Sequence, residues 1–530
     1  TGDPRNCSQE SDSQGRPLAL PSPRLVSRTV HLITDTPGEV SGLLMQFGQF
    51  VDHDVTGTSS TRGISGAIMC CDQQGPLHEA CLPIDVPPGD THYTDKRCIN
   101  FVRSLHATDN SNVTLVPRQQ RNEVTSYLDG SVVYGSSDEH VAKLRSFKGG
   151  ELTSSGNDML PLAADGSCMA KDGLCLTSGD ARVNEVPGLG ALHIIFHRQH
   201  NLLARQLAAI FPRDVTASTS VVDEAIFQTA RRILGAQLQH VVYTEWLPLV
   251  LGPFATQHYD LSRGRHLYDV HRDPSVANVF AAAAFRFGHS LVPDWLTVGK
   301  DRIPLHSTFS DPGLARHNMD DLLVGLLQSA AQTRDQFFVT SIRNRLFEPA
   351  PRRGLDLVAM NIQRGRDHGL PPYQSWREAC GLSPVQGFND SVLGSAGPAL
   401  REVYMSVEDI DLFTGAMSER PLGGAVVGET LACLIGRQFA DLKHGDRFFY
   451  ETSGPEGFTE GQLQYIRQTT MAGLICANTH SISSVQANAF LKPSARNPTV
   501  SCSQRKSPIS LHAWKDDLIR LVHTLQFSGR

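Results

Sequence analysis

The segment LGALHIIFHRQHNLLARQLAAIF, residues 189–211, decides the fold class. Its apolar residues recur at the spacing of one helix face, at Leu192, Ile195, Phe196, Leu203, Leu207 and Ile210. Residues 222–251, 276–292 and 318–332 also have helical periodicity, whereas alternating, strand-like runs are few and short. The sequence therefore predicts a mainly α fold with few short strands.

The chain is predicted to form one large helical domain. Its length of 530 residues would allow about three or four domains. However, we find no internal repeat, no low-complexity tract and no long linker. Residues 1–24 are rich in Pro, Ser and Gly and are expected to form an irregular N-terminal arm. The domain then covers residues 25–530.

Composition and charge exclude several classes of protein. A net charge of −6 with 40% hydrophobic and 19% charged residues is typical of a soluble globular protein, and it indicates no nucleic-acid partner. No run of 18 or more uncharged apolar residues occurs, and the nearest candidate, residues 279–292, contains Arg286 and His289. We therefore expect no membrane span.

The eleven cysteines favour disulfides over a zinc site, because no CxxC pair occurs. N-glycosylation sequons begin at Asn6, Asn112 and Asn389. Both features predict a secreted, extracellular glycoprotein, whose first residues would then be the start of a processed chain or of a fragment. Cys7 has no obvious partner; it could pair with a removed or separate segment, pair between chains, or be free.

One histidine array suggests a metal site. His193, His197 and His200 could share a helix face, which is a spacing found in zinc enzymes. The zinc-protease motif places a general-base glutamate directly after the first histidine, but here that residue is Ile194. A metallohydrolase is therefore the weaker hypothesis.

Four other short stretches contain residue types suited to catalysis or to cofactor binding. GQFVDHD, residues 48–54, flanks His53 with two aspartates, which fits a solvated turn as well as a metal site. The others contain Arg182 and Glu185, His289 with Arg286 one turn earlier, and Asn361 with Arg364. Each is weak evidence alone, since a histidine among apolar residues is more often a hydrogen-bonded core residue than a ligand.

Together these stretches resemble one family. The order and separation of GQFVDHD, TSYLDGSVVYGS, SGDARVNE, NVFAAAAFRFGHSL and LDLVAMNIQRGRDHGLPPYQSWREACGL are similar to those of the animal haem peroxidases, in the peroxidase–cyclooxygenase superfamily. The similarity runs from about residue 20 to about residue 515 and is greatest to secreted invertebrate peroxidases and to the peroxidase domain of peroxidasin. It implies a helical haem peroxidase domain.

The resemblance assigns catalytic roles. His289 would be the proximal iron ligand, with its other ring nitrogen donating to the side-chain carbonyl of Asn361. His53 would take a proton from peroxide and return it to the leaving oxygen. Arg182 would stabilise the charge that develops as the O–O bond breaks. Gln49 would hydrogen-bond distal water and help to place a halide or pseudohalide.

The resemblance also implies how haem b is held. Asp52 and Glu185 match the carboxylates that form ester bonds to haem, and Arg286 and Arg364 match positions near the propionates. A further sulfonium link would need methionine directly after Glu185, where this chain has Val186. We therefore do not expect chloride oxidation of the myeloperoxidase kind.

The second aspartate of GQFVDHD is assigned to calcium by the same resemblance. Asp54 would bind the ion together with Thr125, Tyr127 through its backbone carbonyl, Asp129 and Ser131, a set of oxygen donors suited to a hard cation. The family likewise implies five disulfides: Cys70–Cys81, Cys71–Cys98, Cys168–Cys175, Cys380–Cys433 and Cys476–Cys502.

These expectations define a secreted, calcium-containing haem peroxidase that reduces hydrogen peroxide and oxidises a small anionic or phenolic donor. Halides, thiocyanate and phenols all fit, and the oligomeric state is left open. One alternative is an adhesion or matrix protein on the same fold. Another is a fatty-acid dioxygenase, which would need a lipid channel and a radical-forming tyrosine.

Overall fold

A computed structural model describes residues 20–63, 66–71, 77–109, 111, 113–212, 215–262, 264, 268–349, 353–505 and 511–528. Cys7 and the sequon asparagines Asn6 and Asn112 lie outside this part of the chain, as does most of the predicted arm. Asn389, the third sequon asparagine, is exposed.

The described chain is mainly helical, which confirms the predicted fold class. The first ten α-helices are α1 Pro23–Val30, α2 Gly42–Val55, α3 Ser131–Tyr134, α4 Asp138–Leu144, α5 Pro187–Ile210, α6 Thr219–Val241, α7 Leu247–His258, α8 Asn278–Ala282, α9 Gly313–His317 and α10 Met319–Gln328. The others are α11 Thr340–Arg343, α12 Leu357–Asp367, α13 Tyr373–Ala379, α14 Gly397–Val403, α15 Leu412–Ser418, α16 Glu429–His444, α17 Glu460–Ile466, α18 Met471–Asn478, α19 Cys502–Arg505 and α20 Lys515–Ser528.

The strands are short and pair two by two, each pair antiparallel, within the described residues. They are β1 Pro37–Ser41 with β8 Ala330–Gln332, β2 Ile84–Asp85 with β3 Cys98–Ile99, β4 Leu162–Ala163 with β5 Cys175–Leu176, β6 Trp295–Val298 with β7 Asp301–Pro304, and β9 Ser484–Gln486 with β10 Thr499–Ser501. Short 3₁₀ segments include η3 Ala181–Asn184 and η5 Ala284–Leu291, and η4 Val242–Trp246 is a π-helical turn.

The predicted helices differ from the observed ones where the chain must bend. Residues 222–251 form α6, the π turn η4 and α7 rather than one regular helix. Residues 276–292 break at Ala283, whose backbone leaves the helical region, and continue as η5. Residues 330–332, at the end of the predicted helix 318–332, form strand β8 because they pair with β1.

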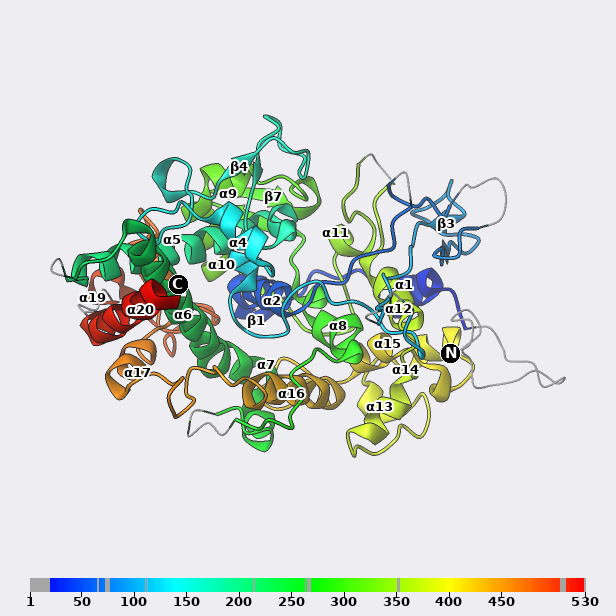
Figure 1. Ribbon diagram of the computed structural model, residues 1–530. Coiled ribbons are helices and arrows are strands. Elements are labelled where there is room, and N and C mark those ends of the chain that lie inside the picture. The colour runs from blue at the N-terminus through cyan, green and yellow to red at the C-terminus, as the bar shows by residue number, and fades with distance from the viewer. Residues whose placement is uncertain are drawn as a thin grey trace.

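Helix α5 is the centre of the packing. It contacts α2, α6, α10 and α18, and all of its first fifteen residues are buried. Figure 1 shows α2 near the middle of the molecule, with α5 and α6 on one side and α8 and α12 on the other. The apolar stripe that predicted α5 therefore faces the main hydrophobic core.

Helix α2 is held tightly in this core. Phe47, Phe50 and Val51 are fully buried, and the Trp246 indole donates to the Leu44 carbonyl at 2.9 Å. A Cβ atom at Gly48 would lie 3.1 Å from the Trp246 ring, so glycine permits this close approach. The position of each polar side chain on α2 is fixed as a result.

The five implied disulfides are all present: Cys70–Cys81, Cys71–Cys98, Cys168–Cys175, Cys380–Cys433 and Cys476–Cys502. This confirms the implied pairings, including those at the adjacent Cys70 and Cys71. No helix within the described ranges is both long enough and apolar enough to cross a bilayer.

Candidate functional site

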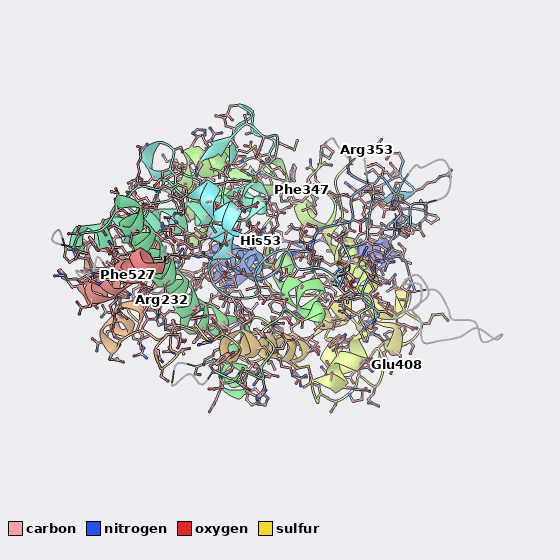
Figure 2. The ribbon with its side chains drawn as sticks, viewed as in Figure 1. His53, Arg232, Phe347, Arg353, Glu408 and Phe527 are labelled. Carbon is pink, nitrogen blue, oxygen red and sulfur yellow. A yellow bond between two sulfur atoms is a disulfide. The ribbon has the colours of Figure 1, made fainter. Side chains whose placement is uncertain are left out.

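Seven of the residues that the sequence predicted for catalysis or haem binding line one cavity of about 290 Å³. They are Gln49, Asp52, His53, Arg182, Glu185, Arg286 and His289. Helix α2 contributes the first three, the segment at η3 the next two, and η5 the last two. Figure 2 shows His53 near the middle of the molecule. Segments distant in sequence thus converge on one cavity.

His53 is ready to accept a proton. The side chain is buried, and among the described residues none hydrogen-bonds either ring nitrogen. Its Nδ1 lies 3.6 Å from Asp180 Oδ1 and its Nε2 lies 3.9 Å from Glu185 Oε2. Burial and the charge of Arg182 lower the pKa of His53 well below its usual value. The ring is therefore neutral near pH 7.

Asp180 is a site residue that the sequence reasoning missed. Its carboxylate accepts from Arg182 Nε at 2.9 Å and from Arg182 Nη2 at 2.7 Å. Burial opposes ionisation of Asp180, but the charge and hydrogen bonds of Arg182 outweigh burial and lower its pKa below the usual range. Arg182 Nη2 also donates to the Thr56 carbonyl at 2.7 Å, so the guanidinium is fixed beside His53.

His289 lies on η5 and has one ring nitrogen free. Its Nδ1 is 2.8 Å from Asn361 Nδ2, and no described residue hydrogen-bonds its Nε2. The Asn361 oxygen accepts from Arg286 Nη1 at 3.0 Å. This corrects the prediction that the Asn361 carbonyl faces the ring: Arg286 can only donate, so the amide turns its oxygen to Arg286. Burial and the charge of Arg286 lower the pKa of His289 to about 3.

The two predicted ester carboxyls both line the cavity. Gln49 Nε2 donates to Glu185 Oε2 at 3.2 Å. Burial raises the pKa of Glu185 to about 7 and also raises that of Asp52. Val186, next to Glu185, lines the cavity too and offers no sulfur for a further bond.

Arg364 does not line this cavity. Its Nη1 donates to Ser104 Oγ at 2.8 Å, to Asp367 Oδ2 at 3.0 Å and to the Val102 carbonyl at 3.1 Å. The guanidinium is thus already bonded to protein groups outside the cavity lining.

The residues predicted to bind calcium lie beside α2. Val132 N–H and Gly130 N–H donate to the Asp54 carboxylate at 2.9 and 3.2 Å. Thr125 Oγ1 and Ser131 N–H donate to Asp129 Oδ1 at 3.0 and 2.9 Å. Tyr127 lies in the same loop and is partly buried.

The charges of these two aspartates support a cation site. Burial first, and then the neighbouring charge of Asp129, raise the pKa of Asp54 well above its usual value. Burial likewise raises the pKa of Asp129. The described residues contain no cluster of three or more His, Cys, Asp or Glu side chains suited to a metal. Carboxylate, hydroxyl and backbone oxygens are the donors that a hard cation such as calcium takes.

The histidine array of α5 does not form a metal site. His193 Nδ1 bonds Ser178 Oγ at 2.8 Å, and His197 Nε2 bonds Ser154 Oγ at 2.8 Å. His200 bonds the Tyr134 hydroxyl at 2.7 Å and the Gly150 carbonyl at 2.9 Å. The three rings contact different partners and are core residues. This array therefore does not supply the metal ligands that the metallohydrolase hypothesis needs.

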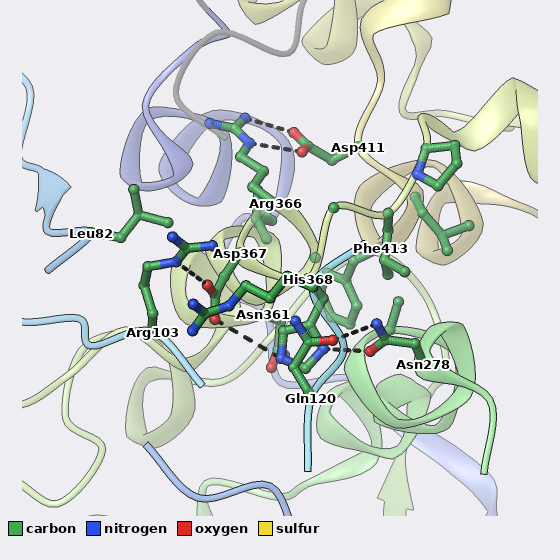
Figure 3. A pocket seen from close by; sticks show the side chains of 18 of the residues that line it. Leu82, Arg103, Gln120, Asn278, Asn361, Arg366, Asp367, His368, Asp411 and Phe413 are labelled. Atoms are coloured by element: carbon green, nitrogen blue, oxygen red, sulfur yellow. Dashed lines mark hydrogen bonds and ion pairs between the residues drawn. The ribbon is translucent and has the colours of Figure 1, made fainter. Parts of the chain in front are cut away.

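A second cavity of about 820 Å³ is lined by Asn361, the residue that contacts His289 (Figure 3). Arg366 donates to both oxygens of Asp411, and Arg103 donates to Asp367. His368 is bonded at both ring nitrogens, to Ser104 Oγ and to Asn278 Oδ1. The charged side chains labelled in Figure 3 pair with one another, so we place the chemistry in the smaller cavity.

The fold and site define a mainly helical protein whose cavity is lined by one histidine from each of two distant segments, His53 and His289. The model of the family described as animal haem peroxidase matches residues 4–490. The chain belongs to the animal haem peroxidase family, whose members hold haem and use hydrogen peroxide with electron donors. The match begins inside the segment predicted as an irregular arm.

Named relatives agree with this assignment. The chain is 35% identical to chorion peroxidase of Drosophila melanogaster, over 95% of this chain and 65% of the relative. It is 35% identical to human peroxidasin homolog, over 94% of this chain and 35% of the relative. It is also 35% identical to mouse myeloperoxidase, over 89% of this chain and 69% of the relative. The chain thus spans about two thirds of the chorion peroxidases and about a third of the peroxidasins.

Solved structures share the fold. Peroxidase A of Dictyostelium discoideum superposes with a TM-score of 0.74 at 28% identity, covering 92% of this chain and 93% of that one. Fatty acid alpha-dioxygenase of Oryza sativa gives a TM-score of 0.69 at 18% identity, covering 90% of this chain and 83% of that one. The second likeness shows a common fold alone.

Proposed function

We propose that this protein is a secreted haem peroxidase that reduces hydrogen peroxide and oxidises a small anionic or phenolic donor. The observation that carries the proposal is the convergence of His53, Arg182 and His289 on one cavity. The family assignment supplies the cofactor. Haem, when bound, supplies the iron that exchanges electrons with peroxide.

The free Nε2 of His289 is the group we assign to the iron. Its Nδ1 already contacts Asn361, which fixes the orientation of the ring. For the Asn361 carbonyl to accept from Nδ1, the amide must turn over and release Arg286. Arg286 lines the cavity and would then be free to pair with a propionate carboxylate.

His53 and Arg182 would act on peroxide. A neutral His53 takes the proton of the bound peroxide and returns it to the departing oxygen, which leaves as water. Arg182 donates toward the oxygen on which negative charge grows, and Asp180 holds the guanidinium for this task. Gln49 lies one turn before His53 on α2 and would orient water or a small anion there.

Three further features belong to the proposal. Asp52 and Glu185 would bond covalently to haem, because both carboxyls line the cavity. Asp54 and Asp129 would bind calcium with Thr125, the Tyr127 carbonyl and Ser131. Secretion is supported by the five disulfides, by the exposed sequon at Asn389 and by relatives named chorion peroxidase.

The fatty-acid dioxygenase hypothesis has less support. The cavity does have an apolar wall, which includes Leu291, Leu296 and Phe309. However, no tyrosine occurs among the described residues that line it, so no phenol could form a radical in contact with a bound lipid. This wall also suits the ring of a phenolic donor, which keeps phenols among the candidate donors.

One experiment tests the proposed function directly. The purified protein, supplied with haem, is mixed with hydrogen peroxide in the presence of bromide, thiocyanate or a phenol, while absorption and peroxide are followed. We expect a haem absorption band that shifts on adding peroxide, with donor-dependent consumption of peroxide. A haem-bearing protein that leaves peroxide untouched with every donor would be an inactive member of the fold, as in the adhesion hypothesis.

A further inference from the structure

An oxidisable side chain lines the haem cavity but has no role in the proposed reaction. Trp246, in the π turn η4, borders the cavity and is fully buried. Its indole N–H donates to the Leu44 carbonyl at 2.9 Å. Because an amide carbonyl is a very weak base, an oxidised Trp246 would keep its proton and remain a cation. Such a cation is a strong oxidant for a nearby phenol.

Aromatic rings lead from Trp246 away from the cavity. The centroid of its ring lies 6.3 Å from that of Phe439, which lies 6.0 Å from Tyr243. Tyr243 lies 5.2 Å from Phe449, and Phe449 lies 5.0 Å from Tyr450. Each of these rings is at most 3% exposed. Closely packed aromatic rings therefore connect the cavity with Tyr450.

The two tyrosines differ in what accepts their protons. The Tyr243 hydroxyl donates to the Phe439 carbonyl at 2.7 Å, and this oxygen cannot hold the proton. The Tyr450 hydroxyl is 3.0 Å from Nδ1 of His240, and an imidazole can accept and hold this proton. Loss of an electron makes a phenol strongly acidic, so only Tyr450 has a base in place to take its proton. Tyr450 is thus the better final site of oxidation.

We propose that Trp246 and Tyr450 form an internal electron-donor chain for the haem site, a role that rests on the proposed peroxidase function. Peroxide takes two electrons from the site and two protons from solvent, and its two oxygens are released as two waters. Trp246 returns one electron and becomes a radical cation. Tyr450 then reduces Trp246 by one electron while its hydroxyl proton moves to His240. The products are intact Trp246, a neutral Tyr450 radical and protonated His240, and the external donor supplies the second electron.

The burial of the chain indicates what it is for. Tyr450 is 1% exposed, so a bulky donor cannot contact its ring. The chain therefore stores an oxidising equivalent inside the protein when external donor is scarce, rather than passing it to a partner at the surface.

Freeze-quench electron paramagnetic resonance tests this inference. Haem-loaded protein is mixed with hydrogen peroxide and no donor, with tyrosine ring-deuterated in a parallel sample. We expect a tyrosyl signal, narrowed by deuteration, in the wild type. Tyr450→Phe removes only a hydroxyl and should abolish that signal. Tyr243→Phe is the matched control and should retain it.

Variants of Trp246 test the first step. Trp246→Phe should lose the tyrosyl signal, whereas Trp246→Tyr keeps an oxidisable ring and should still form a radical. If Trp246→Phe does not hold haem, the inference is tested by comparing the tyrosyl signals of Tyr450→Phe and Tyr243→Phe alone. An unchanged tyrosyl signal in Tyr450→Phe overturns the inference.

The inference can fail separately from the proposed function. Wild-type protein that consumes peroxide with a phenol, yet gives no tyrosyl signal without one, overturns the donor chain and leaves the peroxidase function standing. Wild-type protein that consumes no peroxide with any donor overturns both.

Discussion

Asp54 and Asp129 meet at Ser131. The Ser131 hydroxyl donates to Asp54 Oδ1 at 3.3 Å, while its backbone N–H donates to Asp129 Oδ1 at 2.9 Å. Two like charges are thereby brought together, one of them fully buried. Repulsion and burial both favour the protonated forms, and a bound cation would reverse that preference.

We expect calcium to raise the thermal midpoint of the protein and Asp129→Asn to remove most of this shift. The substitution keeps the shape of the side chain but deletes one charge. A ligand at about one hundred times its dissociation constant stabilises the folded state by about 2.7 kcal/mol. Melting with and without a chelator measures the effect. Asp138→Asn, at an exposed acid nearby, is the control. Equal calcium shifts in both variants would contradict the assignment.

His53→Ala should slow the reaction with peroxide by about 10²–10⁴-fold, the usual contribution of a general acid and base. Haem should remain bound, because His289 is untouched. Stopped-flow absorption measures the rate. The matched control is His193→Gln, which alters a buried histidine bonded to Ser178 outside the cavity lining. A rate that falls only in the control would refute the role of His53.

Asp180→Asn should slow the same reaction by about 10–100-fold, the range typical of residues that orient a catalytic group. The amide keeps one acceptor for Arg182 but loses the charge that fixes the guanidinium. Asp172→Asn breaks a more exposed Arg–Asp pair, with Arg316, away from the cavity and should have no effect. If both variants react like the wild type, Arg182 does not depend on Asp180.

Haem should stay with the wild-type chain through acid and organic extraction if ester bonds form. The double variant Asp52→Asn, Glu185→Gln should release it, since an amide cannot form the ester. Glu245→Gln is the matched control: burial raises the pKa of Glu245 to about 7 as well, but this residue does not line the cavity. Release of haem from the wild type would exclude covalent attachment.

Buried His197 should make the protein less stable in acid. Burial lowers its folded pKa to about 4, whereas an unfolded histidine titrates near pH 6.5. Between these values the unfolded state binds more protons, so the free energy of unfolding falls as pH falls, by up to about 1.4 kcal/mol per pH unit. Denaturant midpoints of the wild type and His197→Gln, from pH 7.5 to 4.5, measure the difference. A constant difference over this range would show that the pKa of His197 is the same in the folded and unfolded states.

Much of the fold could be predicted from local patterns. The stripe of α5 specified a buried helix correctly because its period depends only on neighbouring residues. The end of α10 could not be predicted in the same way. Residues 330–332 continue a helical pattern, but β1 offers them strand pairing from a distant part of the chain. The break at Ala283 likewise depends on tertiary packing.

The candidate site was predicted to a similar extent. Motifs placed His53, Arg182 and His289 at one cavity, because family resemblance carries long-range information that periodicity lacks. Asp180 was missed, although an acid two residues before Arg182 was a visible signal. The orientation of the Asn361 amide depends on Arg286 reaching it from η5, and no local pattern encodes that contact.

The placement of Asp52, His53 and Asp54 on consecutive positions of α2 has a consequence for engineering. Each residue of a helix is rotated by about 100° from the last, so the three side chains point in three directions. Deleting or inserting one residue between the anchored start of α2 and Asp52 would turn all three together, away from their partners. Loop grafts and domain fusions can therefore alter the chain on either side of α2, but they must preserve its register.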